Sequence, residues 1–437
     1  MQSDLIGEFA VQNDYSKLPA SVRERTNLAV LNFLAVTIGA NKYPQSTSLI
    51  KACTTIQGGK LPIFGANSTA GLIGSAWANS ALSHILDFDD THLKSIFHPS
   101  APVISSTLSL ALNDGSSGND VIYASALGME VGIRLAVAVG LDERYSDWHN
   151  TSLYGTSASA VASSIMKHGS ADQVSASLLQ GLTVATGFLS NRGTVTKSFQ
   201  VGRSAAEGIM GAIATLSGVT VSKNMINTFA KSLSKNYKLD LLAEGFGNEW
   251  NVLKNFLKPY PCGVVLHPGI DAAIEMRKKN IDYSEIKEIH VYVNPVVMVL
   301  TAIMEPKSGL ESKFSVSHTI AAALAYGPLY PEHFSDAAVM DQLTLEIRKK
   351  IHVHEKEDVN KGQTIIEAIF KDGRKEVVDI NRGPETPSKL LDKNDVHNKF
   401  QHLVVPVMGE DKTREIWAYF SDMESKKDLS EASDLFL

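Results

Sequence analysis

The sequence predicts a mainly α-helical protein that carries a smaller α+β unit in its C-terminal half. From Pro19 to about Lys258 the apolar residues follow helical spacing, among many Ala, Ser, Gly and Leu residues. From about Ile281 the pattern changes to the period-two alternation of half-buried strands. From Lys389 onward helical spacing returns. We therefore expect the C-terminal tail to pack back on the first, helical domain.

Within the first region we expect helices over residues 20–38, 123–139, 156–167 and 203–216. Small residues such as Gly128 and Gly132 line one side of the second of these and allow close backbone packing. Glu130 and Arg134 on the same helix argue against a membrane-spanning reading of this spacing. A tightly packed soluble helical bundle is the stronger interpretation.

The second region shows strand patterns at residues 289–293 and 351–354. Residues 364–370 and 376–380, joined by a polar turn at 371–374, give the clearest hairpin signal in the chain. A buried, Ala-rich helix is expected at residues 318–326, between these strands. Helical patterning over 396–403 and 412–420 marks the tail.

The composition limits the class of protein. A chain of 437 residues with 44% hydrophobic and 20% charged residues is typical of a folded protein of two or three domains. A formal net charge of -6 disfavours a general nucleic-acid or acidic-membrane binder. The two cysteines are too few for a disulfide framework and favour a reducing compartment. Residues 1–15 resemble neither a signal nor a transit peptide, so we expect a cytoplasmic protein and leave a mitochondrial location open.

Several standard sites are not indicated. The sequence contains no phosphate-binding Gly-rich loop, no dinucleotide fingerprint and no Gly-x-Ser-x-Gly elbow. Two cysteines cannot supply the three thiolates of an aconitase-type iron–sulfur cluster. His352 and His354 share one face of a strand, and an exposed surface pair is the stronger reading than a metal site. The sequence therefore predicts no metal and no cofactor.

The densest polar cluster lies between residues 84 and 102. Three carboxylates and three imidazoles fall within fifteen residues: His84, Asp87, Asp89, Asp90, His92 and His98. If the preceding helix ends near Leu86, the acidic run lies at its C-terminal end, which is unfavourable for negative charge. The carboxylates would then hold cationic side chains or orient a histidine. The alternatives are a solvated acidic loop and a divalent-cation site at the Asp89–Asp90 pair.

Further candidates stand alone in small-residue surroundings. His149 precedes a predicted helix, Lys197 comes before the helix that Arg203 is expected to begin, and Lys258 leads into His267 at the domain boundary. Taken singly, each is better read as a capping or surface residue. Together they could converge on a ligand with several carboxylates.

These residues belong to motifs that occur in a fixed order along the chain: Asp87-Phe-Asp-Asp-Thr91 with His98-Pro99-Ser100, Thr196-Lys197 before Gly202, Lys258-Pro-Tyr-Pro-Cys262 with His267, and Lys313-Phe314-Ser315-Val316. In them, and over essentially the whole chain, the sequence resembles the MmgE/PrpD family. That family includes 2-methylcitrate dehydratases, cis-aconitate decarboxylases and iminodisuccinate epimerases. The resemblance implies a large all-helical domain (residues 1–266 and 389–437) and an α+β lid (267–388). It also implies a homodimer that needs no metal or cofactor and binds a small polycarboxylate in a basic cleft.

The resemblance also implies a set of site residues. Asp87, Thr91, His98, His149, Lys197, Lys258 and His318 correspond to pocket positions of the family. On this basis we expect His98 and His149 to transfer protons, Asp87 to orient a histidine, and His318 to act as a second acid or base. Substrate contacts are expected from Thr91, Lys197, Lys258, Arg203 and His267.

The reaction stays open at this stage. The decarboxylases carry tyrosine where Ser315-Val-Ser-His318 ends in histidine. The tryptophan-containing insert of the 2-methylcitrate dehydratases is missing after Thr91. The leading expectation is a citrate-type dehydratase. An iminodisuccinate-type epimerase, a cis-aconitate decarboxylase and a non-catalytic polycarboxylate-binding protein follow in that order.

Overall fold

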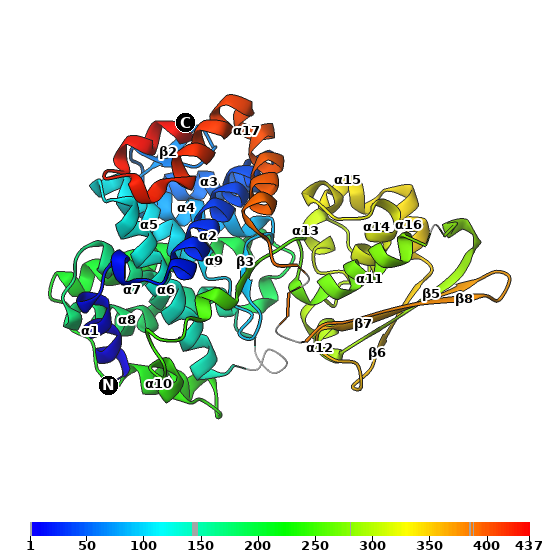
Figure 1. Ribbon diagram of the computed structural model, residues 1–437, viewed down its shortest axis with the longest axis horizontal. Coiled ribbons are helices and arrows are strands. Elements are labelled where there is room, and N and C mark those ends of the chain that lie inside the picture. The colour runs from blue at the N-terminus through cyan, green and yellow to red at the C-terminus, as the bar shows by residue number, and fades with distance from the viewer. Residues whose placement is uncertain (1, 142–146, 280, 384–385, 388) are drawn as a thin grey trace.

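The computed structural model describes residues 2–141, 147–279, 281–383, 386–387 and 389–437 (Figure 1). The described residues form two hydrophobic cores. The first is built from residues between Ile6 and Leu257 and again between Leu391 and Phe436. The second lies between Cys262 and Val378. The predicted class, mainly α with a smaller α+β part, is confirmed. The C-terminal limit expected for the lid, residue 388, lies outside the described residues.

The first core is surrounded by helices from both ends of the chain. They are α1 (Gln2–Gln12), α2 (Ala20–Gly39), α3 (Gln45–Ile56), α4 (Leu72–Ile85), α5 (Ser100–Asp114), α6 (Gly118–Val139), α7 (Asn150–Met166), α8 (Ala171–Val184), α9 (Val195–Leu216), α10 (Met225–Leu233) and α17 (Lys393–Ser421). The tail helix α17 packs against α2 (Figure 1). This part is not wholly helical, because it also holds two antiparallel strand pairs: β1 (Leu61–Ile63) with β2 (Ser68–Ala70), and β3 (Asp90–His92) with β4 (Asn255–Leu257).

Close packing of α6 on α7 explains the glycines predicted to line α6. A Cβ atom at Gly128 would lie 2.7 Å from Cβ of Ala162, and one at Gly132 would lie 2.7 Å from Cβ of Ala158. Larger side chains would force the two helices apart. Among the described residues, α6 is the one helix long and apolar enough to cross a membrane. Nearly all of that stretch is buried inside the protein, as in the core helix of a globular protein.

Several helices begin earlier than the predicted ranges. α6 starts at Gly118 rather than at 123, and α9 starts at Val195 rather than at 203. α7 starts at Asn150, directly after His149 as expected there, although regular helical spacing was recognised only from 156. The first turns of α7 and α9 contain Ser and Thr, residues of weak helix propensity, and tertiary burial outweighs that weakness. Lys197 therefore lies in the first turn of α9 and not in a loop before it.

The second core lies between a four-stranded sheet and helices. The helices are α11 (His267–Arg277), α12 (Pro295–Leu300), α13 (Gly309–Ser312), α14 (Val316–Tyr326), α15 (Asp336–Val339) and α16 (Gln342–Arg348). The sheet has the order β6 (Ile351–Glu355), β5 (Ile286–Val293), β7 (Gln363–Phe370) and β8 (Lys375–Asn381). β5 and β6 are parallel, and the predicted β7–β8 hairpin is present. Helices α11 and α14 contact the sheet strands (Figure 1).

The segment between α4 and α5 lies where these parts meet. After α4 ends at Ile85, Asp87 adopts a left-handed conformation with φ of 51°, and β3 then pairs with β4. Aspartate tolerates this conformation better than most side chains. The turn directs residues 87–98 toward the junction with the α+β part, where the candidate site is found.

Candidate functional site

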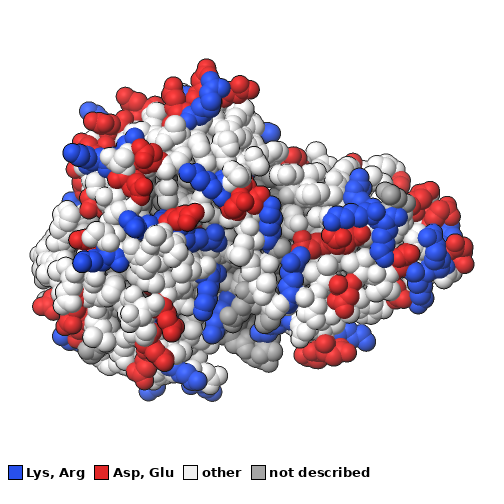
Figure 2. Space-filling model, viewed as in Figure 1, with Lys and Arg blue, Asp and Glu red and all other residues white. Residues whose placement is uncertain are grey.

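A cavity of about 70 Å³ lies between the helical and the α+β parts. Five residues expected in the site line it: Asp87, His98, His149, Lys197 and Lys258. The α+β part and the segment leading into it contribute Val264, Val265, Leu300, Thr301 and Phe314. An adjoining hollow of about 380 Å³ shares several lining residues with the cavity and is also lined by Lys94, His267 and Lys361. Lys and Arg side chains flank the hollow between the two parts in the space-filling view (Figure 2).

Asp87 is the buried carboxylate of the cavity and is held by two lysines. Its Oδ1 lies 2.8 Å from Nζ of Lys197, and its Oδ2 lies 3.4 Å from Nζ of Lys258. Burial by itself would raise the pKa of Asp87, but the two ammonium groups outweigh it and hold the pKa well below its usual range. Asp87 therefore holds cationic side chains, one of the two roles expected for the carboxylates of this run, rather than orienting a histidine as the family resemblance implied.

The acidic run as a whole is buried, so the alternative of a solvated loop is wrong. Asp87 is 3% exposed, and Asp89 and Asp90 are fully buried. Asp90 accepts hydrogen bonds from the Ser100 hydroxyl and the Asn255 side chain. Burial raises the pKa of Asp90, against the effect of the Ser100 hydrogen bond. Asp89 and Asp90 use their oxygens on different partners and do not form a paired cation site.

Three consecutive backbone carbonyls in this segment each accept a hydrogen bond from a buried lysine. Leu86 accepts from Lys313 (2.7 Å), Asp87 from Lys258 (3.0 Å) and Phe88 from Lys399 (2.7 Å). Burial lowers the pKa of Lys313 to about 7 and that of Lys399 well below its usual value. The lysine N–H donors satisfy the carbonyls at and just beyond the C-terminal end of α4, which lack partners within the helix. The sequence analysis assigned no role to Lys313 or Lys399, which reach the segment from 227 and 311 residues away.

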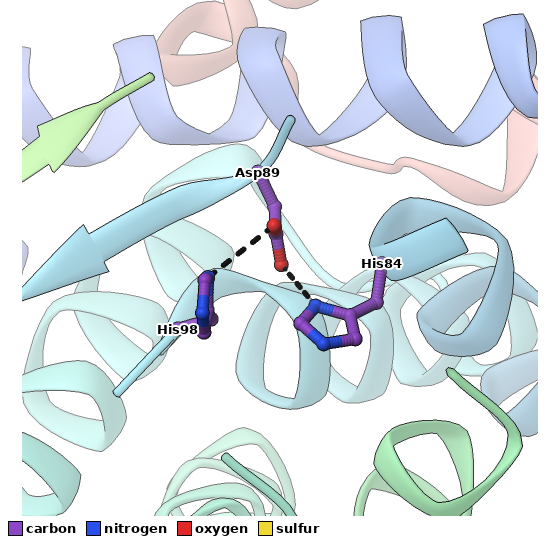
Figure 3. A group of neighbouring side chains, drawn as sticks. All are labelled: His84, Asp89 and His98. Carbon is purple, nitrogen blue, oxygen red and sulfur yellow. Dashed lines mark hydrogen bonds and ion pairs between the residues drawn. The ribbon is translucent and has the colours of Figure 1, made fainter. Parts of the chain in front are cut away.

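Asp89 lies between two imidazoles (Figure 3). Its Oδ2 is 2.6 Å from Nδ1 of His84, and its Oδ1 is 3.3 Å from Nδ1 of His98. Burial would raise the pKa of Asp89, but these two contacts hold it well below its usual range. Burial lowers the pKa of His84 to about 4, in spite of Asp89. The contact between His84 and Asp89 is therefore a hydrogen bond from a neutral His84 imidazole to an ionised Asp89 carboxylate.

The same three side chains offer ligand atoms within 4.8 Å of one another. Their arrangement fits hydrogen bonding better than ion coordination, because both Nδ1 atoms point at the carboxylate oxygens rather than at a shared point. Lys258 Nζ lies 4.0 Å from Asp89 Oδ1, where it would repel a cation.

His98 reaches the cavity from the start of α5. Its Nδ1 lies 2.7 Å from the carbonyl oxygen of Asp90 and 3.0 Å from the hydroxyl of Thr91. Thr91 is fully buried behind the His98 ring and is not among the residues lining the cavity. The structure thus places Thr91 against a site histidine, whereas the sequence expectation was a substrate contact.

His149 occupies the N-cap position of α7, as its place in the sequence suggested, but its side chain does not accept a hydrogen bond from the first turn's backbone. Its Nδ1 lies 3.0 Å from the Ser152 hydroxyl and 3.0 Å from Nε2 of Gln200. Burial holds the pKa of His149 well below its usual value, and the nearby Lys197 lowers it further. Gln200 was missed by the sequence analysis. Its place one helical turn after Lys197 on α9 is the signal that could have pointed to it.

Two of the expected substrate-binding residues lie away from the small cavity. Arg203 forms an ion pair with Glu207 at 3.1 Å and reaches backbone carbonyls near the end of α8. His267 begins α11 and lines the adjoining hollow, where its ring lies against those of Phe256 and Tyr260. Burial lowers the pKa of His267 to about 3, so this ring is neutral near pH 7.

His318 is buried within α14 and does not line the cavity. Its Nε2 donates to the carbonyl of His333 at 2.9 Å, and its ring packs against Phe334. Burial lowers the pKa of His318 to about 4. The α+β part therefore brings no imidazole from this position to the cavity.

The His352-x-His354 pair lies on the outer face of the sheet beside His290. His290 Nδ1 is 2.9 Å from His354 Nε2, and the His290 and His352 rings stack at 5.4 Å. Because His290 Nδ1 and His354 Nε2 face each other in a hydrogen bond, they do not converge on an ion.

Family models and a known protein match most of this chain. The model of the MmgE/PrpD N-terminal domain matches residues 4–240, and that of the MmgE/PrpD C-terminal domain matches residues 260–424. A cis-aconitate decarboxylase-like protein of Aspergillus oryzae, oryM, is 23% identical, and the alignment covers 95% of this chain and 93% of that protein.

Proposed function

The chain belongs to the MmgE/PrpD family, and on that premise we propose that it is a cofactor-independent lyase acting on a small polycarboxylic acid. The leading reaction is dehydration of a citrate-like hydroxy acid. One observation carries the proposal: two imidazoles and two ammonium groups line the same cavity around one buried carboxylate.

Several features of the cavity suit an anion with more than one carboxylate. His98 lies just before α5, His149 occupies the N-cap position of α7, and Lys197 lies in the first turn of α9. The N-termini of these three helices, each with partial positive charge, are therefore at the cavity together with the lysines. The adjoining hollow adds Lys94 and Lys361, which extends the positive lining beyond the small cavity.

The chemistry follows from where charge develops. Removal of a proton next to a carboxylate places negative charge on that carboxylate, and nearby cations and hydrogen-bond donors stabilise it. In dehydration, the electron pair of the broken C–H bond forms the double bond, and the hydroxyl leaves as water after it takes up a proton. Histidines are suited to move these protons near neutral pH.

Decarboxylation is the second candidate, and the name of the Aspergillus oryzae relative favours it. It uses the same stabilisation, because the electron pair left when carbon dioxide departs also lies next to a carboxylate. Epimerisation by two bases was favoured by His318 as the second base. Since His318 does not line the cavity, that support is lost. We also propose that residues 267–388 form a lid and that the protein works as a homodimer.

Proton NMR of the purified protein in D₂O, with citrate, 2-methylcitrate, cis-aconitate and iminodisuccinate, tests the reaction class. We expect loss of water from a hydroxy acid of this panel, seen as a new vinyl signal from citrate or, from 2-methylcitrate, as its methyl doublet becoming an olefinic methyl singlet. Loss of carbon dioxide from cis-aconitate would instead establish the second candidate. If no acid reacts and none raises the melting temperature, the proposal is wrong.

Replacing Lys197 with methionine tests the anion-binding role. A charge-assisted hydrogen bond contributes about 1.5–3 kcal/mol, so we expect KM to rise about 10–100-fold. Lys223→Met is the matched control, because the Lys223 side chain is 72% exposed and its ion pair with Asp4 is long, at 3.8 Å. An unchanged KM in the Lys197 variant would remove Lys197 from substrate binding.

A further inference from the structure

The hydrogen bonds around His98 determine which ring nitrogen carries its proton. Nδ1 lies 2.7 Å from the backbone carbonyl of Asp90 and 3.3 Å from the Asp89 carboxylate. Both groups only accept hydrogen bonds, because Asp89 is ionised. The Thr91 hydroxyl, at 3.0 Å, can serve as acceptor or donor. Nδ1 must therefore carry the proton, and in the neutral ring Nε2 is an unprotonated base.

The hydrogen-bond partners of His149 place its proton on the other ring nitrogen, Nε2. The Gln200 amide is oriented by the backbone of Phe188, which donates to Oε1 at 3.1 Å and accepts from Nε2 at 3.1 Å. Asn191 also donates to Oε1, at 3.3 Å. The Gln200 NH₂ group therefore faces His149 and donates to Nδ1. Since Nδ1 accepts, the proton of the neutral ring lies on Nε2.

The two rings also differ in the charge around them. His98 lies against the Asp89 carboxylate, which stabilises an imidazolium after proton uptake. For His149, burial and the neighbouring Lys197 disfavour an imidazolium. A neutral imidazole with a fixed N–H is suited to donate a hydrogen bond to an oxygen that becomes negative. Within the part of the chain that the structure describes, no hydrogen bond occupies Nε2 of either ring.

We propose that His98 is the base of this site, that His149 is a neutral hydrogen-bond donor, and that Gln200 is the positioning residue that sets the proton of His149 on Nε2. This division of roles rests on the proposed function and goes beyond it, because the two histidines had been given equivalent roles.

In the dehydration, His98 Nε2 takes the proton from the carbon next to a carboxylate. The electron pair of that C–H bond moves toward the carboxylate, whose oxygens gain negative charge and accept from His149 Nε2–H. The pair then forms the carbon–carbon double bond as the C–O bond breaks. The departing hydroxide takes the proton from His98 and leaves as water, which restores neutral His98.

The first test needs no substrate. With ¹⁵N-labelled histidine, NMR distinguishes protonated from unprotonated ring nitrogens, and His98→Gln and His149→Gln variants assign the signals. We expect Nδ1–H for His98 and Nε2–H for His149. The same tautomer in both rings, or a charged His149 near pH 7, would overturn the inference whether or not any acid reacts. The expected tautomers in a protein that turns over no acid would count against the proposed function alone.

The second test is Gln200→Glu, in which an ionised carboxylate accepts from His149 Nδ1 and shifts the proton away from Nε2. A wrong tautomer in a serine protease triad costs about 10⁴-fold in turnover, and we expect kcat to fall by about 10²–10⁴-fold here. The His149 signals should change to Nδ1–H. The ratio of variant to wild-type kcat should rise as pH falls, because a protonated Glu side chain can donate again.

Gln12→Glu is the control, since Gln12 is exposed at the end of α1. A purely structural role for Gln200 would lower kcat by the same factor at every pH and leave the His149 tautomer unchanged. That result would overturn the positioning role.

Discussion

Replacing His98 with glutamine is expected to lower kcat by about 10²–10⁴-fold, the usual contribution of a positioned acid or base. Glutamine keeps a polar side chain next to the Asp90 carbonyl but offers no base to the cavity. KM should change much less, because Lys197 and Lys258, the lysines proposed to bind the substrate carboxylates, remain. Steady-state kinetics on the acid that reacts in the NMR panel measures both quantities.

His402→Gln is the matched control, because the His402 side chain is 41% exposed and lies outside the residues that line the cavity. Circular dichroism and the melting temperature establish that both variants are folded. Turnover of the His98 variant within a few-fold of wild type would remove His98 from the mechanism and leave the cavity without the base assigned to it.

Replacing Asp87 with asparagine is expected to have the largest effect on stability. The change leaves the buried Lys197 and Lys258 without the carboxylate that they share. Breaking a buried ion pair by removal of one partner costs about 3–5 kcal/mol. Asparagine tolerates the left-handed backbone at this position, so the loss of charge is the main change. Denaturant unfolding at pH 7 measures the difference in the free energy of unfolding.

The pH dependence of this difference provides a second check. The pKa of Asp87 is lower in the folded than in the unfolded chain, where it is about 3.9. The stabilisation is therefore complete above about pH 4 and is lost as the pH falls through the folded pKa. The melting temperatures of wild type and variant should approach each other below pH 4.

Asp411→Asn, at an 87% exposed side chain, is expected to show no such convergence. If the difference in melting temperature between wild type and the Asp87 variant stays constant with pH, the ion pairs of Asp87 do not cause it.

The periodicity of the sequence was sufficient for the fold class and for most elements. The strands at 289–293 and 351–354 and the hairpin after residue 363 are local patterns, and local patterning decides which face of a strand is buried. The starts of α7 and α9 were harder to predict, because first turns that contain Ser and Thr have weak helix propensity and depend on tertiary packing. The motifs likewise predicted five of the residues that line the cavity.

Partners from distant parts of the chain were beyond what spacing can predict. Gln200 orients His149 across 51 residues, and Lys399 reaches the Phe88 carbonyl across 311. His318 matched a pocket position by motif, yet its helix turns the ring toward the His333 carbonyl.

The sequence by itself determined the helical and α+β parts and the residue types that the site contains. Only the tertiary structure decided which carboxylate holds the lysines and which contacts His98, because burial and charge pairing are set by groups brought together from different segments. It likewise decided the tautomer of each histidine, since a ring nitrogen takes its proton from the hydrogen-bond partners that the fold places beside it.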